Sequence, residues 1–158
     1  MAVLSDTTAE LAQALLARGW SLSTAESCTG GLVAAACTEL SGSSVWFERG
    51  FVTYSNAAKT EMLGVPAALI EAHGAVSEPV ARAMVEGALR HSAAQVALSI
   101  TGVAGPTGGS ADKPVGTVCF AWATPAGVFS ERLHLSGDRA AVRHAAAQHA
   151  LIGLLQRL

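Results

Sequence analysis

The sequence predicts an α/β fold in which helices cover both faces of a mixed β-sheet. Strand-like runs alternate with helix-like segments along most of the chain, and a mainly apolar run of the buried-strand type occurs at residues 95–100. Strands joined by helices pair in parallel through right-handed crossovers. Two late strand-like runs flank Pro125-Ala126-Gly127, which is typical of an antiparallel hairpin. The length of 158 residues predicts one domain spanning residues 1–158.

Five helices are expected from the positions of capping residues and helix breakers. Thr7-Thr8-Ala9-Glu10 fits the capping box with which many helices begin. Asn56, Ser77 and Asp138 are also of types favoured at the N-cap, and Pro79 suits a first helical turn. In order, the expected helices span residues 7–18, 30–40, 57–63, 78–92 and 138–158.

Five strands are expected from runs rich in β-branched and aromatic residues. They span residues 20–24, 47–54, 95–100, 116–124 and 128–135. A glycine-rich loop is expected over 101–114. Ligand sites in open α/β sheets lie at the carboxyl ends of strands. The segments that follow Thr24, Thr53 and Ile100 are therefore the candidate site.

Composition and charge exclude several classes of protein. Hydrophobic residues make up 51% of the chain and charged residues 14%, which indicates a globular protein. A net charge of −2 without a basic stripe disfavours nucleic acid as a main partner. No apolar run approaches the roughly 20 residues of a spanning helix, and the N-terminus does not resemble a signal peptide. We therefore expect no membrane association and a cytoplasmic location, with reduced cysteines, of which Cys37 and Cys119 lie in the core.

The turn after the first expected strand, Ala25-Glu26-Ser27-Cys28-Thr29-Gly30-Gly31, is the first candidate for chemistry. A nucleophile there would lie beside helix N-terminal N–H groups that can bind an oxyanion. The two glycines would let a ligand approach the backbone closely. Ser27 is one candidate, Cys28 is a rival because a helix N-terminus lowers a thiol pKa, and Thr29 is a third. The alternative is a capping serine in an ordinary strand-to-helix turn.

A second candidate pair lies after the second expected strand. Tyr54 is the one tyrosine of the chain, and Lys59 is one of only two lysines. A lysine can act as a base if burial lowers its pKa, whereas arginine stays protonated. The alternative is a solvated helix lysine beside a half-buried strand tyrosine.

The third candidate is the glycine-rich segment from Thr101 to Ser110. It lacks the Gly-Lys-Ser/Thr of a Walker loop, but its N–H groups could hold a phosphate or a ribose. The alternative is a flexible connector before the hairpin. The histidines form neither HExxH nor a close cluster, so no metal site is expected.

Six motifs together resemble the CinA C-terminal domain family, in order and over nearly the whole chain. They are Ala25-Glu26-Ser27-Cys28-Thr29-Gly30-Gly31, Gly50-Phe51-Val52-Thr53-Tyr54-Ser55-Asn56, His73-Gly74-Ala75-Val76-Ser77, Gly102-Val103-Ala104-Gly105-Pro106, Lys113-Pro114-Val115-Gly116-Thr117-Val118 and Ser136-Gly137-Asp138-Arg139. The resemblance implies a three-layer α/β/α sandwich with a mixed, mostly parallel sheet. It also implies hydrolysis of nicotinamide mononucleotide to nicotinic acid mononucleotide and ammonia, in pyridine nucleotide recycling, without a metal or another cofactor.

The family's catalytic serine, lysine and tyrosine correspond to Ser27, Lys59 and Tyr54. The resemblance implies that neutral Lys59 activates Ser27, which forms an acyl-enzyme, while Tyr54 orients Lys59 or relays a proton. N–H groups near Thr29, Gly30 and Gly31 would hold the oxyanion. The residues expected to bind the oxyanion or the substrate, with the phosphate on the glycine-rich loop, are Cys28, Thr29, Gly30, Gly31, Asn56, Thr101, Gly102, Gly105, Gly108, Gly109 and Arg139.

Two other functions fit the same residues. One is an amidase or esterase of a different substrate, and the other is a nucleotide-binding or regulatory module without turnover. A homo-oligomer is also expected, because the last helix carries an alanine-rich face that another subunit could cover. That face comprises Ala140, Ala141, Ala145, Ala146, Ala147 and Ala150.

Overall fold

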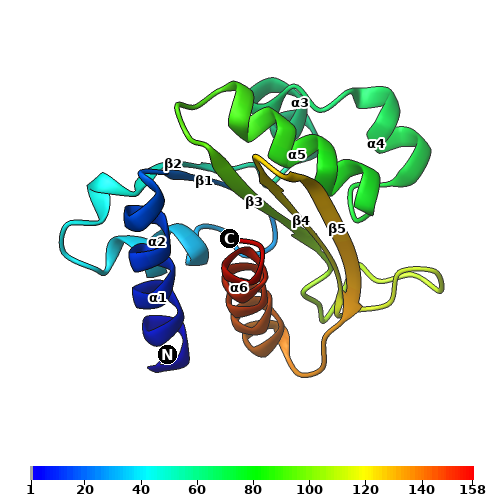
Figure 1. Ribbon diagram of the computed structural model, residues 1–158. Coiled ribbons are helices and arrows are strands. Elements are labelled where there is room, and N and C mark those ends of the chain that lie inside the picture. Colours follow the sequence, from blue (N-terminus) through cyan, green and yellow to red (C-terminus); the bar gives the residue numbers. More distant parts are fainter. Residues whose placement is uncertain (1) are drawn as a thin grey trace.

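The computed structural model, which describes residues 2–158, places one five-stranded sheet between two layers of helices (Figure 1). The strands are β1 (Leu22–Glu26), β2 (Phe47–Val52), β3 (Val96–Gly102), β4 (Thr117–Thr124) and β5 (Gly127–His134). Their order across the sheet is β2-β1-β3-β4-β5. β1 pairs in parallel with β2 and β3, whereas β4 is antiparallel to β3 and to β5. The sheet is therefore mixed, as predicted.

Helices cover both faces of this sheet. They are α1 (Ala2–Arg18), α2 (Leu32–Thr38), α3 (Asn56–Leu63), α4 (Ala67–His73), α5 (Glu78–Arg90) and α6 (Arg139–Gln156). α1, α2 and α6 pack on one face, and α3, α4 and α5 lie on the other (Figure 1). This arrangement confirms the three-layer α/β/α sandwich. None of the helices described is long and apolar enough to cross a membrane.

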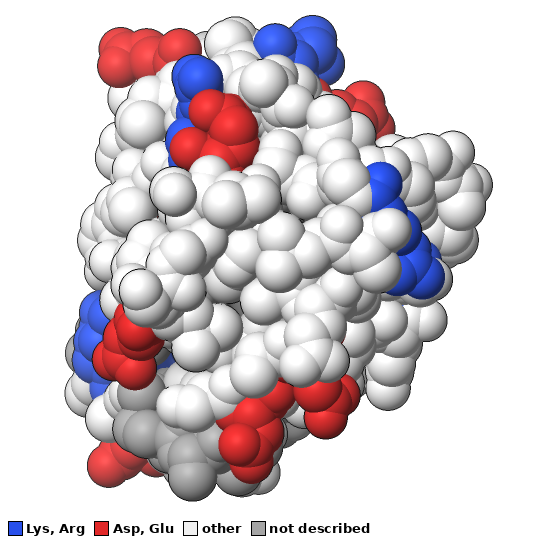
Figure 2. Space-filling model, turned by 60° about the vertical axis from the view of Figure 1, so that its left-hand side comes forward, with Lys and Arg blue, Asp and Glu red and all other residues white. Residues whose placement is uncertain are grey.

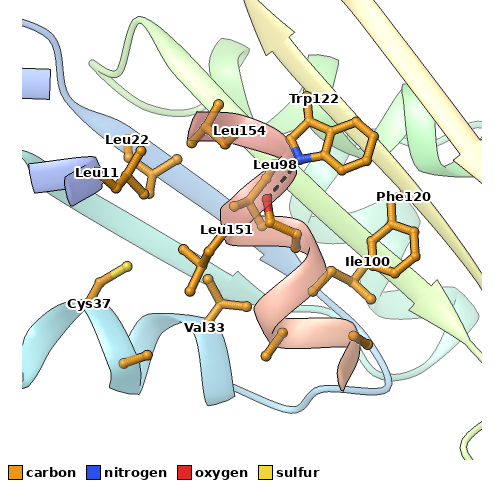
Figure 3. Packing of buried hydrophobic residues seen from close by; sticks show 14 of the residues in the cluster. Leu11, Leu22, Val33, Cys37, Leu98, Ile100, Phe120, Trp122, Leu151 and Leu154 are labelled. Atoms are coloured by element: carbon orange, nitrogen blue, oxygen red, sulfur yellow. Dashed lines mark hydrogen bonds between the residues drawn. The ribbon is translucent and has the colours of Figure 1, made fainter. Parts of the chain in front are cut away.

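Side chains of the central strands alternate between the two cores, because successive residues of a strand point to opposite faces. Leu98, Phe120 and Trp122 project toward α6, where the Trp122 indole N–H donates to the Ala150 carbonyl at 2.8 Å (Figure 3). Smaller side chains such as Cys119 project toward α5. The continuous apolar character of β3 and β4 thus reflects burial on both faces.

Close packing of α3 on α5 depends on Gly87 of α5. A Cβ atom at that position would lie 2.0 Å from the carbonyl oxygen of Leu63, the last residue of α3. The glycine therefore lets the two helix backbones touch. This contact matters for the site, because α3 carries Lys59.

Several predicted helix boundaries were wrong. α1 begins at Ala2, so the predicted capping box from Thr7 to Glu10 lies inside the helix, where the Thr8 hydroxyl donates to the Ser5 carbonyl. α3 is capped by Ser55, one residue before the predicted cap, and Asn56 is its first residue. α2 is shorter than predicted, and α4 was not predicted at all. The caps at Ser77 and Asp138 are confirmed, since each accepts from an N–H three residues ahead.

Strand predictions were closer to the structure. β3 extends to Gly102, so Thr101 and Gly102 belong to a strand and not to the glycine-rich loop. The hairpin turn consists of Pro125 and Ala126, because Gly127 already pairs with Thr124. The cysteines are free and buried, which confirms the two core positions predicted for them.

The alanine-rich face of α6 is largely used within the chain. Ala146, Ala147 and Ala150 are fully buried in the core that α6 shares with α1 and the sheet, so they cannot face another subunit. A homo-oligomer remains a prediction, but these three residues cannot form its interface.

On the face seen in Figure 2, acidic and basic side chains are interspersed among a mainly uncharged surface.

Candidate active site

The three candidate segments meet at one edge of the sheet. Ser27 directly follows β1, Thr53 directly follows β2, and Thr101 lies at the end of β3. These strands are parallel, so their carboxyl ends share an edge, where sites in open sheets form. A cleft of about 240 Å³ opens there. It is lined by Ser27, Cys28, Tyr54, Asn56, Lys59, Ala75, Val76, Thr101, Gly102, Ala104 and Arg139.

Glu26 and Ser27 diverge at the end of β1, as strand alternation requires. The Glu26 carboxylate is fully buried on the α2 side of the sheet. It accepts hydrogen bonds from the Thr29 hydroxyl at 2.6 Å and from the N–H groups of Gly31, Val33 and Ala34 at 3.0–3.2 Å. Glu26 thus accepts hydrogen bonds from the main-chain N–H groups at the start of α2, which have no partner within the helix. The Ser27 side chain lies on the opposite side, next to Lys59.

Lys59 contacts three oxygen atoms with its buried amine. Its Nζ lies 3.0 Å from Ser27 Oγ, 2.9 Å from the Thr53 carbonyl oxygen and 3.3 Å from that of Tyr54. Lys59 is 1% exposed and Ser27 7%. Lys59 projects from the first turn of α3, and Ser55 fixes the start of that helix.

This arrangement suits a neutral amine that acts as a base. A neutral amine has two N–H donors and one lone pair, so the two carbonyls can take the donors and the lone pair can accept the Ser27 proton. Burial lowers the pKa of Lys59, because an ammonium is poorly solvated there. Within the described part of the chain, no carboxylate lies within ion-pair distance of Lys59 to oppose that shift.

Cys28 lines the cleft but is not an activated thiol. Burial raises the pKa of its thiol to about 11, so the lowered pKa predicted from its place at a helix N-terminus was wrong. Burial is the main physical reason, and the negative charge of Glu26, whose carboxylate also occupies the N–H groups at the start of α2, adds to it.

The predicted oxyanion donors also need correction. The Gly30 N–H donates to the Ser27 carbonyl at 3.0 Å, and the Gly31 N–H donates to Glu26, so neither is free to bind an oxyanion. By contrast, the N–H groups of Cys28 and Thr29 donate to no main-chain carbonyl within residues 2–158, and of the two residues Cys28 lines the cleft. The Cys28 N–H is therefore the remaining donor beside Ser27.

Tyr54 and Arg139 form the outer wall of the cleft. The Tyr54 side chain is 63% exposed, and its phenol oxygen accepts from Arg139 Nη2 at 3.2 Å. Arg139 Nη1 donates to the Gly105 carbonyl at 2.7 Å. Tyr54 therefore contacts Lys59 through its main-chain carbonyl, and its phenol contacts Arg139.

Not all of the predicted binding residues reach the cleft. Asn56, Thr101 and Gly102 line it, and the Thr101 hydroxyl donates to the Ala75 carbonyl at 2.9 Å. The predicted residues that do not line it are Thr29, Gly30, Gly31, Gly105, Gly108 and Gly109.

Three lining residues were not predicted as site residues: Ala75, Val76 and Ala104. All three lie within motifs that carried the family resemblance, but their apolar side chains gave no chemical signal. Among the described residues, no group of three His, Cys, Asp or Glu side chains could hold a metal ion.

A three-layer α/β/α sandwich with a serine–lysine pair at the carboxyl edge of its sheet defines the structural class. The profile of the CinA C-terminal domain matches residues 4–158. The chain belongs to the CinA C-terminal domain family.

Relatives support this assignment over almost the full length of the chain. The nicotinamide-nucleotide amidohydrolase PncC of Escherichia coli K12 is 56% identical over 149 residues, which cover 94% of this chain and 90% of that protein. A competence-damage inducible protein of Symbiobacterium thermophilum is 60% identical over 146 residues, but the chain covers only 34% of that longer protein. The crystal structure of the competence/damage inducible protein CihA of Agrobacterium tumefaciens has a TM-score of 0.95 and 42% identity, covering 98% of this chain and 94% of that one.

Proposed function

We propose that this protein hydrolyses the carboxamide of nicotinamide mononucleotide to nicotinic acid mononucleotide and ammonia, with Ser27 as nucleophile and Lys59 as base. The observation that carries the mechanism is the buried Lys59 amine, 3.0 Å from Ser27 Oγ and held by two carbonyls. The substrate is supported by the similarity to PncC proteins, which are named for that activity.

The reaction proceeds through an ester of Ser27. Neutral Lys59 takes the Ser27 hydroxyl proton as Oγ attacks the carboxamide carbon. The tetrahedral intermediate collapses when its C–N bond breaks, and the Lys59 ammonium returns the proton to the departing nitrogen, which leaves as ammonia. Water then attacks the ester carbon as Lys59 accepts a proton from it. The Lys59 ammonium returns that proton to Ser27 Oγ as the ester C–O bond breaks, and the carboxylic acid product loses its remaining proton to solvent and leaves as a carboxylate.

The N–H group of Cys28 stabilises the oxyanion in this mechanism. Cys28 follows Ser27 and lines the cleft, and its N–H donates to no main-chain carbonyl among the described residues. One donor of this kind contributes about 3 kcal/mol to transition-state binding. Glu26 does not compete for this N–H, because it binds N–H groups farther along the turn and in the first turn of α2.

The rest of the substrate extends from Ser27 toward the outer wall of the cleft. The pyridine ring lies against the apolar walls formed by Ala75 and Val76, and the phosphate binds near Arg139. Arg139 can offer a guanidinium donor there by exchanging its bond to the Tyr54 phenol. This placement moves the phosphate away from Gly108 and Gly109, which do not line the cleft.

Ammonia release in the presence of a chelator tests this proposal. Nicotinamide mononucleotide, nicotinamide riboside and free nicotinamide are supplied in parallel at equal concentrations. We expect the mononucleotide to have the highest kcat/KM and the chelator to have no effect. Faster turnover of another amide would indicate a different amidase, and absence of turnover by the folded protein on any amide would indicate a binding or regulatory role.

A further inference from the structure

Arg143 reaches from α6 to the turn that carries Ser27, although it does not line the cleft. Its Nε donates to the Cys28 carbonyl at 3.0 Å, and its Nη2 donates to the Thr29 carbonyl at 3.2 Å. More than one hundred residues separate the partners in sequence. Arg143 is one helical turn beyond Arg139, so a single face of α6 supplies both guanidinium groups.

These two bonds fix the direction of the peptide groups in the turn. In a trans peptide the C=O and N–H bonds point in opposite directions. The Cys28 carbonyl faces Arg143, so the N–H of the same peptide group, which belongs to Thr29, points away from Arg143 and donates to no main-chain carbonyl within residues 2–158. In the next peptide group the Thr29 carbonyl also faces Arg143, and the N–H of Gly30 donates to the Ser27 carbonyl.

Glu26 holds the same turn through different atoms. Its buried carboxylate binds the Thr29 hydroxyl and the N–H group of Gly31, whereas Arg143 binds carbonyl groups. Thr29 is therefore fixed by an anion at its side chain and by a cation at its carbonyl. Gly30 leaves room for this, since a Cβ atom there would lie 3.3 Å from Arg143 Nη2.

We propose that Arg143 is a positioning residue for the reaction, which acts together with Glu26 to hold the turn that presents Ser27 and Cys28 to the cleft. The choice of substrate in this inference rests on the proposed function, whereas the contacts of Arg143 do not depend on it. The guanidinium is required because two of its nitrogen atoms reach successive carbonyls in one rigid plane. A lysine would supply the charge but not this paired contact.

The test compares Arg143→Met and Arg143→Lys with the parent. Arg157→Met is the matched control, because Arg157 lies just past the other end of α6 and also donates to a main-chain carbonyl, that of Gly153. kcat and KM for ammonia release from nicotinamide mononucleotide are measured for each. The rate at which a fluorophosphonate modifies Ser27 is measured by mass spectrometry, since Oγ attack on phosphorus expels fluoride and places an oxygen in the same oxyanion site. Thermal midpoints report folding.

We expect both Arg143 variants to lose about 10- to 100-fold in kcat and in the fluorophosphonate rate, with KM changed less. Arg157→Met should stay within about twofold in both rates, whatever its midpoint. A third variant, Arg143→Ala, leaves space for a small cation, and added guanidinium at millimolar concentration should restore part of its activity. Arg143→Met that keeps both rates near those of the parent would overturn the proposal, as would losses that only follow a lower midpoint.

Failure of the proposed function would look different. A parent that releases no ammonia but reacts with the fluorophosphonate at Ser27 would sink the deamidase, and the Arg143 variants would still test positioning through the labelling rate. Glu26→Gln is a weaker probe, because its fully buried carboxylate binds several donors and the variant can fail by misfolding.

Discussion

The Lys59 amine lies 3.0 Å from the Ser27 hydroxyl oxygen, although the two residues are 32 positions apart in sequence. One side chain comes from the turn after β1 and the other from the first turn of α3. Both are buried, and Lys59 has no carboxylate partner among the described residues. Burial without a carboxylate partner favours the neutral form of Lys59, which can act as a base, over the charged form.

The pH dependence of activity should report the protonation of Lys59. Burial lowers the pKa of Lys59 below its ordinary value of 10.5, and only the neutral amine can accept the Ser27 proton. We therefore expect kcat/KM to rise with pH through this lowered pKa and to level off below pH 10.5. A profile that keeps rising with a midpoint near 10.5 would show that Lys59 is not perturbed or not the base.

The same shift should appear in stability. The folded-state pKa of Lys59 is below its unfolded value, so between the two values the unfolded chain binds the extra proton and the free energy of unfolding rises with pH. Lys59→Met lacks this contribution, while the other titrating groups are shared. Denaturant unfolding from pH 7 to 10.5 should show that the free energy of unfolding of the parent increases relative to that of Lys59→Met. A constant difference across that range would contradict burial of the amine.

Tyr54→Phe distinguishes the role of the Tyr54 main-chain carbonyl from that of its phenol. The variant keeps the carbonyl that holds Lys59 and loses only the phenol oxygen that accepts from Arg139. We expect kcat to change little and KM to stay the same or fall, because Arg139 no longer has to give up a bond to the phenol when it binds the phosphate. Steady-state kinetics decide this. A loss of kcat comparable to that of a nucleophile variant would assign the phenol to the proton relay instead.

Gly87→Ala tests how α5 positions Lys59. The new Cβ atom would lie 2.0 Å from the Leu63 carbonyl oxygen, so α3 must shift away from α5. We expect a loss of about 1–3 kcal/mol in the free energy of unfolding, together with a lower kcat. Glu86→Ala, at an exposed position of the same helix, is the control and should change neither. Equal stability of the two variants would mean that the helix contact is not tight.

The sequence was sufficient to predict the layers of the fold and the edge of the sheet that holds the site. Alternating elements and the late hairpin determine a mixed sheet, and parallel strands bring the segments after Thr24, Thr53 and Ile100 together. Local capping was less predictable. The segment from Thr7 to Glu10 matches a capping box in sequence, but it lies inside a helix that extends from Ala2 to Arg18, where the Thr8 hydroxyl donates to the Ser5 carbonyl.

The residues that sequence reasoning missed act through contacts that no local pattern encodes. Glu26 was part of a recognised motif, yet its binding of the turn before α2 depends on which face of β1 its side chain occupies. The alternation of side chains between Glu26 and Ser27 was the one sequence feature that could have indicated that face. Arg143 gave no signal, because its partners in the turn after β1 are brought to it only by the packing of α6. The error about the Cys28 pKa has the same origin, since the burial that raises it, and the nearby Glu26 carboxylate that adds to it, arise only when the chain is folded.

The most direct test is ammonia release from nicotinamide mononucleotide, with chelator present, by the parent and by Ser27→Ala, Lys59→Met and Cys28→Ala. We expect Ser27→Ala and Lys59→Met each to lose at least about a thousandfold in kcat, since a nucleophile and its base act as one unit. Cys28→Ala should keep most of the activity, because its raised thiol pKa makes it a poor nucleophile at neutral pH. Turnover that survives Ser27→Ala, or that is lost with Cys28→Ala in a folded protein, would contradict the serine–lysine mechanism.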